Sequence, residues 1–397
     1  MQTAAIIAEY NPFHNGHAFH IAQTRSLGYN CIVAVLGGNF TQRGEVSSFP
    51  KDVKCRAALL GGADLVVELP AAYSLATAER FAFGAVNIIG SMGCVDAVSF
   101  GSECGDISQL EKAVNALSDK RIDTVITNHL QSGISYAAAR AKAVKELYGA
   151  DISNILEAPN NILAVEYMRH LKSYPDIKPV AIKRRGEHDS SLPYSDRIAS
   201  ASHIRSLILD GKSENALEYV PEQIKSTYLS AISEGKAACD MKRIESAVLA
   251  KLRSMDISDF AKLPDVSEGL ENRFYTCARN AGSLDEFYSS VKTKRYALSR
   301  IRRITMHAFL GITEDVQQIF PPYIRILGFN KVGESLIKKM KSRAALPVSS
   351  SLFQLSKLQG NASLVAQLEE RCSNLFYLSM PHPYRCGCEY TYKIQKI

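Results

Sequence analysis

The chain has 397 residues, which is long for one compact domain and predicts two or three of them. Hydrophobic residues make up 46% of it, charged residues 22%, and the net charge is +7, a composition that excludes disordered and fibrous classes. It has no apolar run long enough to span a membrane and no secretory pattern at its start. We therefore expect a cytoplasmic protein with no membrane contact.

Strand-like and helix-like segments alternate over the first 210 residues. Short apolar runs bounded by Gly, Pro, Asn or Asp predict buried strands at residues 4–8, 31–36, 64–69, 95–100 and 179–182. Helical patterns between them predict helices at residues 18–27, 51–60, 76–92, 107–117 and 136–148. This alternation predicts an α/β fold with a Rossmann-like parallel sheet, whose ligands bind beyond the carboxyl ends of the strands.

The pattern changes after residue 210. Helical spacing without strand-like runs of Val and Ile predicts helices at residues 214–219, 222–233, 244–255 and 283–290. Alternation at residues 390–394 predicts a further strand near the end of the sequence. We therefore expect two domains, an α/β domain over residues 1–210 and a mostly helical domain over residues 211–397.

Two histidines, His14 and His17, stand in a His-Asn-Gly-His turn between the first predicted strand and helix. Gly16 lets the backbone approach a ligand closely, and the helix N-terminus presents free N–H groups to it. Both imidazoles can donate to phosphate oxygens and stabilise the charge that develops when an α-phosphate is attacked. Two alternatives remain: the pair only caps the helix, or it binds zinc together with His20.

Further polar segments leave predicted strands at the same edge of the sheet. The glycine-flanked loop 37–45 can cover a triphosphate or accept a small carboxylate, or it is a surface turn. Gly101 offers bare backbone to an adenine or a ribose, or it only ends a strand. A helix cap requires only one asparagine, and Asn160 and Asn161 are adjacent. We therefore expect one of the two to face a ligand.

Basic and hydroxyl side chains follow the fifth predicted strand. Arg184 and Arg185 can pair with phosphate oxygens, or they form a loop charge cluster. Ser200 and Ser202 at a helix start, with Arg205 one turn later, form a candidate anion cradle, although hydroxyls are also common helix caps. His188 lies between these segments and either transfers a proton or hydrogen-bonds in its loop. Cys386 and Cys388 have no second pair to complete a metal site, and we predict no metal held by protein ligands.

Positive charge is concentrated between residues 291 and 346, where twelve Lys and Arg face three acidic residues. Residues 292–303 are predicted to form one basic helix with Tyr296 interleaved, and residues 323–329 with later lysines extend its charge. Such a region suits the backbone of RNA, and aromatic rings can stack on its bases; a solvated helix face is the alternative. The predicted RNA-binding residues are Lys292, Lys294, Arg295, Arg300, Arg302 and Arg303.

Together these motifs resemble the HxGH nucleotidylyltransferase superfamily (HUP type), relatives of the class I aminoacyl-tRNA synthetases. Longer strings resemble one family within it, the bacterial tRNA(Met) cytidine acetate ligases. The matching strings lie at residues 8–17, 42–44, 100–103, 159–163 and 292–296 and span most of the chain in order. The resemblance implies an ATP-binding catalytic domain followed by a tRNA-binding domain. One departure is His203, which stands where the serine motif is expected to have a small or hydroxylic residue.

The resemblance implies a ligase that joins acetate to ATP as acetyl-adenylate and acetylates N4 of the wobble cytidine of elongator tRNA(Met). It implies an ATP site made of Ile7, Ala8, Glu9, Tyr10, Asn11, Pro12, Phe13, His14, Asn15, Gly16, His17, Ala18, Phe19, His20, Gly101, Asn160 and Arg185. The choices between Asn160 and Asn161, and between Arg184 and Arg185, stay open.

As a mechanism we expect in-line attack of acetate on the α-phosphate, with His14 and His17 as catalytic residues and Mg²⁺ shielding the phosphates. Ser200, Ser202, Arg205 and Arg185 would hold the pyrophosphate. Three rivals remain. One is a nucleotidylyltransferase that acts on a small coenzyme precursor. Another is an RNA-binding protein with a structural nucleotide. The third is a synthetase relative, which the absence of a Lys-Met-Ser-Lys-Ser string disfavours.

Overall fold

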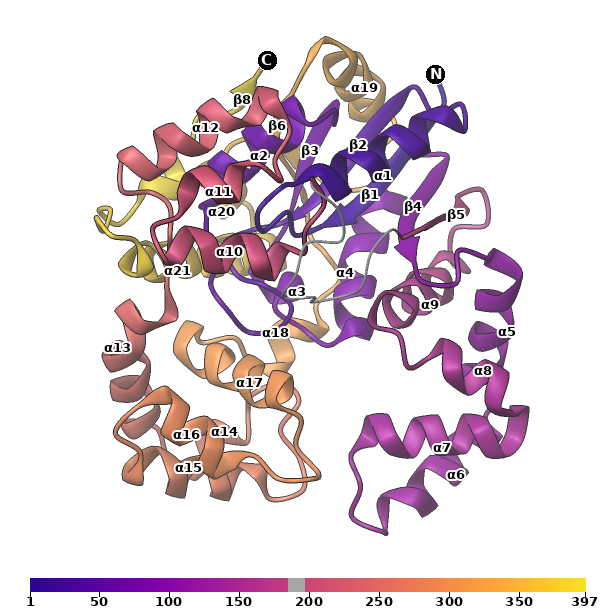
Figure 1. The fold of residues 1–397 in the computed structure, drawn as a ribbon, viewed down its shortest axis with the longest axis vertical. Helices are drawn as coiled ribbons and strands as arrows, with labels where there is room; N and C mark the ends of the chain where they lie inside the picture. Colours follow the sequence, from indigo (N-terminus) through magenta and orange to yellow (C-terminus); the bar gives the residue numbers. More distant parts are fainter. Residues whose placement is uncertain (185–196) are drawn as a thin grey trace.

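The computed structural model describes residues 1–184 and 197–397 and is built around one twisted sheet (Figure 1). The predicted strands are β1 (Thr3–Ala8), β2 (Cys31–Gly37), β3 (Leu65–Leu69), β4 (Ala97–Ser102) and β5 (Lys178–Lys183). They pair in parallel in the order β5-β4-β1-β2-β3. The predicted α/β fold with a parallel sheet is therefore confirmed.

Successive side chains of the strands point into two separate apolar cores, as a sheet covered on both faces requires. Ala5, Val33 and Val67 enter the core on one face, and Ile6, Ile32 and Val66 enter the core on the other. The first core includes side chains of α4 (Ala78–Ser91) and α9 (Pro159–Leu171). The second includes side chains of α1 (Asn15–Ser26), α2 (Lys51–Leu60), α10 (Ala201–Leu209) and α12 (Glu222–Ser233).

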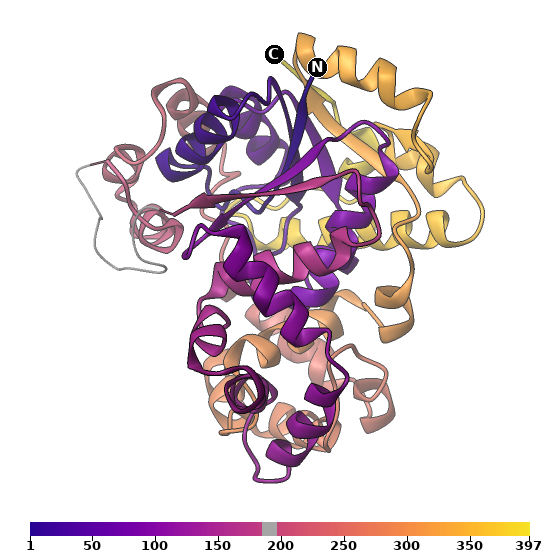
Figure 2. The same ribbon diagram turned by 90° about the vertical axis from the view of Figure 1, so that its right-hand side faces the viewer.

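Two groups of helices extend from the same side of the sheet (Figures 1 and 2). One group is α5 (Ile107–Leu117), α6 (Arg121–Leu130), α7 (Tyr136–Tyr148) and α8 (Ala150–Ile155). The other is α13 (Met241–Arg253), α14 (Ile257–Phe260), α15 (Leu270–Asn280), α16 (Leu284–Val291) and α17 (Leu298–Leu310). The remaining helices are α3 (Ala71–Ser74), α11 (Ser213–Leu217), α18 (Glu314–Gln318), α19 (Lys331–Lys341), α20 (Leu352–Ser356) and α21 (Asn361–Phe376).

The sheet also takes strands from the last third of the chain. β6 (Ile324–Phe329) pairs antiparallel with β3, and β7 (Val348–Ser349) and β8 (Gln395–Lys396) both pair with β6. Residues on both sides of position 210 thus build one sheet, and the domain boundary at that position stays a prediction. No helix within residues 1–184 and 197–397 is long and apolar enough to cross a membrane.

Three local expectations are corrected by the structure. Residues 323–329 do not extend a basic surface, because they form β6 and Arg325 is fully buried. The predicted basic helix begins at Leu298, and residues 292–297 precede it without helical structure. The strand expected in the tail forms, but at Gln395–Lys396 (β8) and not at residues 390–394, because a 3-10 helix covers Cys388–Thr391.

Candidate active site

A cavity of about 750 Å³ opens at the carboxyl edge of the sheet, where the sequence predicts ligand binding. Its wall includes the end of β1, the start of α1, the loop after β2, the start of α9, the start of α10 and the start of α17. The predicted ATP-site residues that line it are Ile7, Ala8, Glu9, Tyr10, Asn11, His14, Gly16, His17, Phe19, His20, Gly101, Asn160, Ser200 and Arg205. The structure therefore brings the histidine turn and the serine–arginine turn to one cavity.

Both histidines of the turn are oriented by the backbone at the start of α1. Nδ1 of His14 accepts a hydrogen bond from the Gly16 N–H at 3.0 Å, and Nδ1 of His17 accepts from the His14 N–H at 3.2 Å. An imidazole that accepts at Nδ1 in its neutral form carries its proton on Nε2. Capping and ligand binding are therefore compatible: Nδ1 caps the helix, and Nε2–H is left to donate to a ligand.

Burial keeps these rings neutral at pH 7. Burial, together with Arg184 and Arg205, lowers the pKa of His14 to about 3. Burial and the neighbouring His14, whose ring centroid lies 3.8 Å away, lower the pKa of His17. A pair of uncharged N–H donors suits an oxyanion that gains charge during a reaction. Across the parts of the chain that the structure describes, no group of three or more metal-ligating side chains could hold a zinc ion.

Gly16 is required where it stands. A Cβ atom at this position would lie 2.8 Å from Cε1 of His14, so any side chain would displace the ring that caps the helix. The third histidine of the turn region, His20, points its Nε2 to the Ser99 hydroxyl at 2.9 Å, and burial lowers its pKa to about 4.

The serine–arginine turn begins α10. Ser200 is the N-cap: its hydroxyl accepts from the His203 N–H at 3.2 Å and contacts the Ser202 hydroxyl at 2.9 Å. Arg205 donates to the Asn11 carbonyl oxygen at 2.9 Å, which ties this turn to the histidine turn. Ser202 does not line the cavity itself, and the His203 ring packs against Tyr219.

The structure separates the two asparagines. Asn160 lines the cavity and accepts from the Arg184 guanidinium at 2.9 Å. Asn161 is buried and accepts from the Ser102 hydroxyl at 2.7 Å, which is a structural contact. Arg184 also lines the cavity, whereas Arg185 lies outside the described residues, as does His188. The choice of Asn160 therefore agrees with the cavity, and the role of Arg185 stays a prediction.

Four residues of the predicted ATP segment do not line the cavity, namely Pro12, Phe13, Asn15 and Ala18. Two of them hold the histidine turn in place. The Phe13 N–H donates to the Tyr228 hydroxyl at 2.8 Å, and the Asn15 side chain donates to the Arg197 carbonyl oxygen at 2.7 Å. These contacts connect the histidine turn to α12 and to the residues just before α10.

The loop after β2 joins the histidine side of the cavity to α17, a connection that the sequence did not reveal. The Gln42 N–H donates to Oε1 of Glu9 at 2.5 Å, and Glu45 forms an ion pair with Arg302 of α17. Gly44 has a φ of +83°, and a Cβ there would lie 2.5 Å from the Arg302 carbonyl carbon. The loop tip is thus pressed between the end of β1 and the backbone of α17.

The predicted RNA-binding residues fall into two sets. Arg300 and Arg303 pair with Asp265, and Arg302 and Arg303 reach the cavity. Lys292, Lys294 and Arg295 are exposed, and the last two line a second cavity of about 660 Å³. Tyr296 is buried, and its hydroxyl donates to the Glu268 carbonyl oxygen at 3.1 Å, so it cannot stack on a base in this arrangement. An RNA role for the six basic residues stays a prediction.

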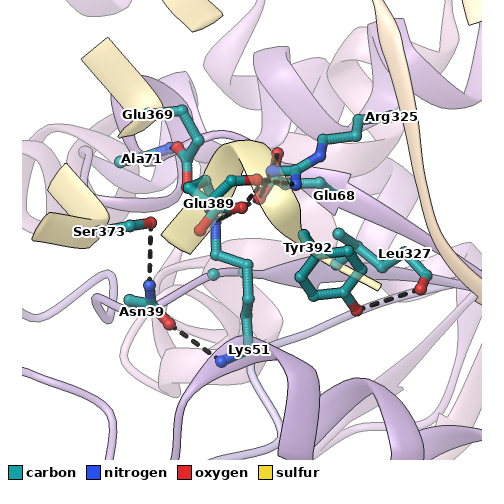
Figure 3. Close-up of polar contacts among 12 residues, drawn as sticks. Asn39, Lys51, Glu68, Ala71, Arg325, Leu327, Glu369, Ser373, Glu389 and Tyr392 are labelled. Carbon is teal, nitrogen blue, oxygen red and sulfur yellow. Dashed lines mark hydrogen bonds and ion pairs between the residues drawn. The ribbon is translucent and has the colours of Figure 1, made fainter. Parts of the chain in front are cut away.

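Behind the same loop lies a buried charge cluster, defined as Lys51, Glu68, Arg325, Glu369 and Glu389 (Figure 3). Lys51 Nζ lies 2.5 Å from carboxylate oxygens of Glu68 and of Glu369. Arg325 pairs with Glu68 at 3.1 Å and with Glu389. Burial and the facing Glu68 raise the pKa of Glu369 to about 7. Three carboxylates thus share two cations and connect α2 and β3 to β6 and α21.

With this geometry established, comparison with known proteins gives the class. A model of the family described as HIGH Nucleotidyl Transferase matches residues 1–386. The chain belongs to this family, as the two turns at the carboxyl edge of the sheet also indicate.

Curated relatives place it more narrowly. A tRNA(Met) cytidine acetate ligase of Clostridium kluyveri is 41% identical over 388 residues, which cover 93% of each chain. A protein of the same name from Thermoanaerobacter sp. is 35% identical over 404 residues, with both chains covered completely. The solved structure of Thermotoga maritima TmcAL bound with alpha-thio ATP superposes with a TM-score of 0.92 at 30% identity over both full chains. The family resemblance carried by the sequence motifs is therefore confirmed.

Proposed function

We propose that this chain is an ATP-dependent ligase that activates acetate as acetyl-adenylate and acetylates N4 of the wobble cytidine of elongator tRNA(Met). A tRNA substrate would place the protein in the cytoplasm. The observation that carries the proposal is the pair of backbone-held imidazoles in the cavity, whose Nε2–H groups are left to donate beside the start of α1. The names of the full-length relatives support acetate and tRNA as the substrates.

The cavity offers suitable groups for each part of ATP. The Nε2–H groups of His14 and His17, at the positive end of the α1 dipole, suit the reacting α-phosphate. The expected free backbone N–H groups of the first turn are not offered to it, because they already donate within the protein. Arg205 and Ser200 suit the pyrophosphate that leaves. Gly101 lets an adenosine lie on bare backbone, although a Cβ there would also approach Arg184 at 3.2 Å. The Thermotoga maritima protein was crystallised with an ATP analogue bound, which supports ATP here.

Mg²⁺ fits this site as an ion held mainly by phosphate oxygens. Mg²⁺ usually keeps several waters and binds substrate phosphate oxygens, which the triphosphate in this cavity would supply. Bound there, the ion would neutralise charge on the triphosphate.

The test separates the two half-reactions. ATP–pyrophosphate exchange should depend on acetate and exceed exchange with propionate or glycine. Labelled acetate should then appear in tRNA, and nuclease digestion should place it on a cytidine of elongator tRNA(Met). Exchange that needs a phosphorylated small molecule in place of a carboxylate would instead support a coenzyme-precursor nucleotidylyltransferase. ATP binding without pyrophosphate release would overturn the ligase proposal.

A further inference from the structure

Acyl transfer to an amine requires a proton acceptor that the histidine turn does not supply. If the proposed function holds, N4 of cytosine attacks the acetyl carbonyl carbon of acetyl-adenylate and must lose one proton. His14 and His17 already accept backbone hydrogen bonds at Nδ1 and carry their protons on Nε2. An Nδ1 that caps a helix has no free lone pair for the substrate. Burial also lowers the pKa values of both rings, which makes them weaker bases. The base must therefore be another group.

Few other side chains lining the cavity can accept a proton. His20 is a weak base, because burial lowers its pKa to about 4, and Glu45 is held in its ion pair with Arg302. Tyr10 and Tyr167 are phenols whose pKa values burial raises further, so at pH 7 they hold their own protons. Among the lining residues that the structure describes, Glu9 is then the group left to act as a base.

Glu9 also lies at a suitable place. It is the first residue after β1, between the histidine turn and the loop that contacts α17. The Gln42 N–H fixes one carboxylate oxygen, Oε1, at 2.5 Å. Ser299, Arg302 and Arg303 of α17 line the same cavity. A cytosine that approaches along α17 to receive the acetyl group would therefore reach the adenylate beside this carboxylate.

We propose that Glu9 is the general base of the acyl-transfer step. The N4 lone pair forms the new C–N bond, and the bond between the acyl carbon and the phosphate oxygen breaks. The electron pair of that bond leaves with AMP, and one N4 proton passes to the Glu9 carboxylate and then to water. The hydrogen bond from the Gln42 N–H keeps Oε1 in place, and the second carboxylate oxygen, Oε2, accepts the amine proton.

The surroundings of Glu9 define its pH response. Burial raises its pKa, while the Gln42 N–H and the side chains of Lys54, Arg205 and Arg43 lower it, and the net shift is upward. Lys54 titrates as well, because burial lowers its pKa to about 7. The other titratable groups near it are Tyr167 on α9 and the histidines of α1, which we assign as neutral at pH 7. A base with a raised pKa acts only above that pKa. Acetyl transfer should therefore rise with pH through the pKa of Glu9 and then level off.

The experiment compares the full chain with its Glu9→Gln variant in three assays: acetate-dependent ATP–pyrophosphate exchange, trapping of acetyl-adenylate by hydroxylamine, and acetyl transfer to tRNA. A general base contributes about 100-fold or more, so the ratio of transfer to exchange should fall about 100-fold. The ratio of hydroxamate to exchange should hold, because hydroxylamine is a strong nucleophile that needs no base. Glu9→Asp should retain part of the transfer and its rise with pH.

Glu45→Gln is the matched comparison, since it removes the other carboxylate that lines the cavity and should leave the pH profile of transfer unchanged in shape. A Glu9→Gln variant with an unchanged ratio of transfer to exchange would overturn the inference. So would a loss of all three activities in proportion, because Glu9 would then serve the first step or the fold. Failure of the proposed function gives a different result: the wild-type chain itself does not acetylate tRNA, whether or not it forms acetyl-adenylate.

Discussion

The histidine turn and the buried charge cluster both adjoin the loop after β2, and they differ in how the chain specifies them. In the turn, each histidine is held by a backbone N–H two or three residues away. In the cluster, the ion pair between Lys51 and Glu369 joins residues 318 positions apart, and that between Glu68 and Arg325 joins residues 257 positions apart. One is local structure, and the other exists only in the complete fold.

The comparison shows two ways to fix a charged or polar group. The turn uses the peptide backbone, so the rings keep their orientation wherever α1 forms. The cluster uses opposite charges without water, and each ion depends on all the others. The loop after β2 contacts both regions: the backbone N–H of Lys51 donates to Asn39 of the loop at 2.9 Å, and the Gln42 N–H of the loop donates to Glu9. We therefore expect damage to the cluster to appear as lost stability and damage to the turn as lost chemistry.

The largest expected effect comes from Arg325→Met. Arg325 is fully buried between Glu68 and Glu389, so its removal leaves carboxylates without their cation (Figure 3). Breaking one partner of a buried pair costs about 3–5 kcal/mol, and the free energy of unfolding in urea should fall by that amount. Lys338→Met is the control: its pair with Glu334 is exposed, and surface pairs contribute about 0–1 kcal/mol. Equal losses in both variants would contradict the assigned role of the cluster.

The same contrast explains what the sequence could and could not predict. The five parallel strands and the histidine turn were predictable because their signals, Val/Ile runs and the His-Asn-Gly-His spacing, lie within a few residues. β6 was missed because its Arg325 reads as a surface charge until Glu68 and Glu389 are seen around it. The start of α17 was misplaced because burial of Tyr296 against Glu268 is a tertiary contact that no local pattern records.

A pair of substitutions at His17 would sharpen the comparison within the turn. Asn can accept the His14 N–H as Nδ1 does but cannot reach the position of Nε2, whereas Gln can place a donor there without the cap. His17→Asn should fold as the wild type does and lose about 2–4 kcal/mol of transition-state stabilisation in acetate-dependent exchange, as expected for one charge-stabilising donor. His17→Gln should retain more exchange. If His17→Asn keeps wild-type exchange activity, then His17 only caps the helix and does not stabilise the transition state.

The candidate site was predictable only along the main chain. The histidine and serine–arginine turns were found because each sits just after a strand or at a helix start, where backbone geometry follows from sequence. The contact of Gln42 with Glu9 and the pair of Glu45 with Arg302 were not found, since they depend on how the loop after β2 folds against α17. Those contacts are also where the proposed acyl-transfer base lies.

The smallest effect concerns acid stability and tests whether the turn region is held uncharged. Burial lowers the pKa of His20 from 6.5 to about 4 in the folded chain, so the unfolded chain binds the proton more readily between these values. Stability is therefore fully present above pH 6.5 and is lost as the pH falls toward 4, by roughly 2 kcal/mol at pH 5 for one such histidine. His20→Gln should remove that share of the loss between pH 7 and pH 5. Comparing the variant with itself at both pH values cancels the cost of its altered contact with Ser99. A variant that loses as much stability as the wild type over this interval would mean that His20 is charged in the folded chain.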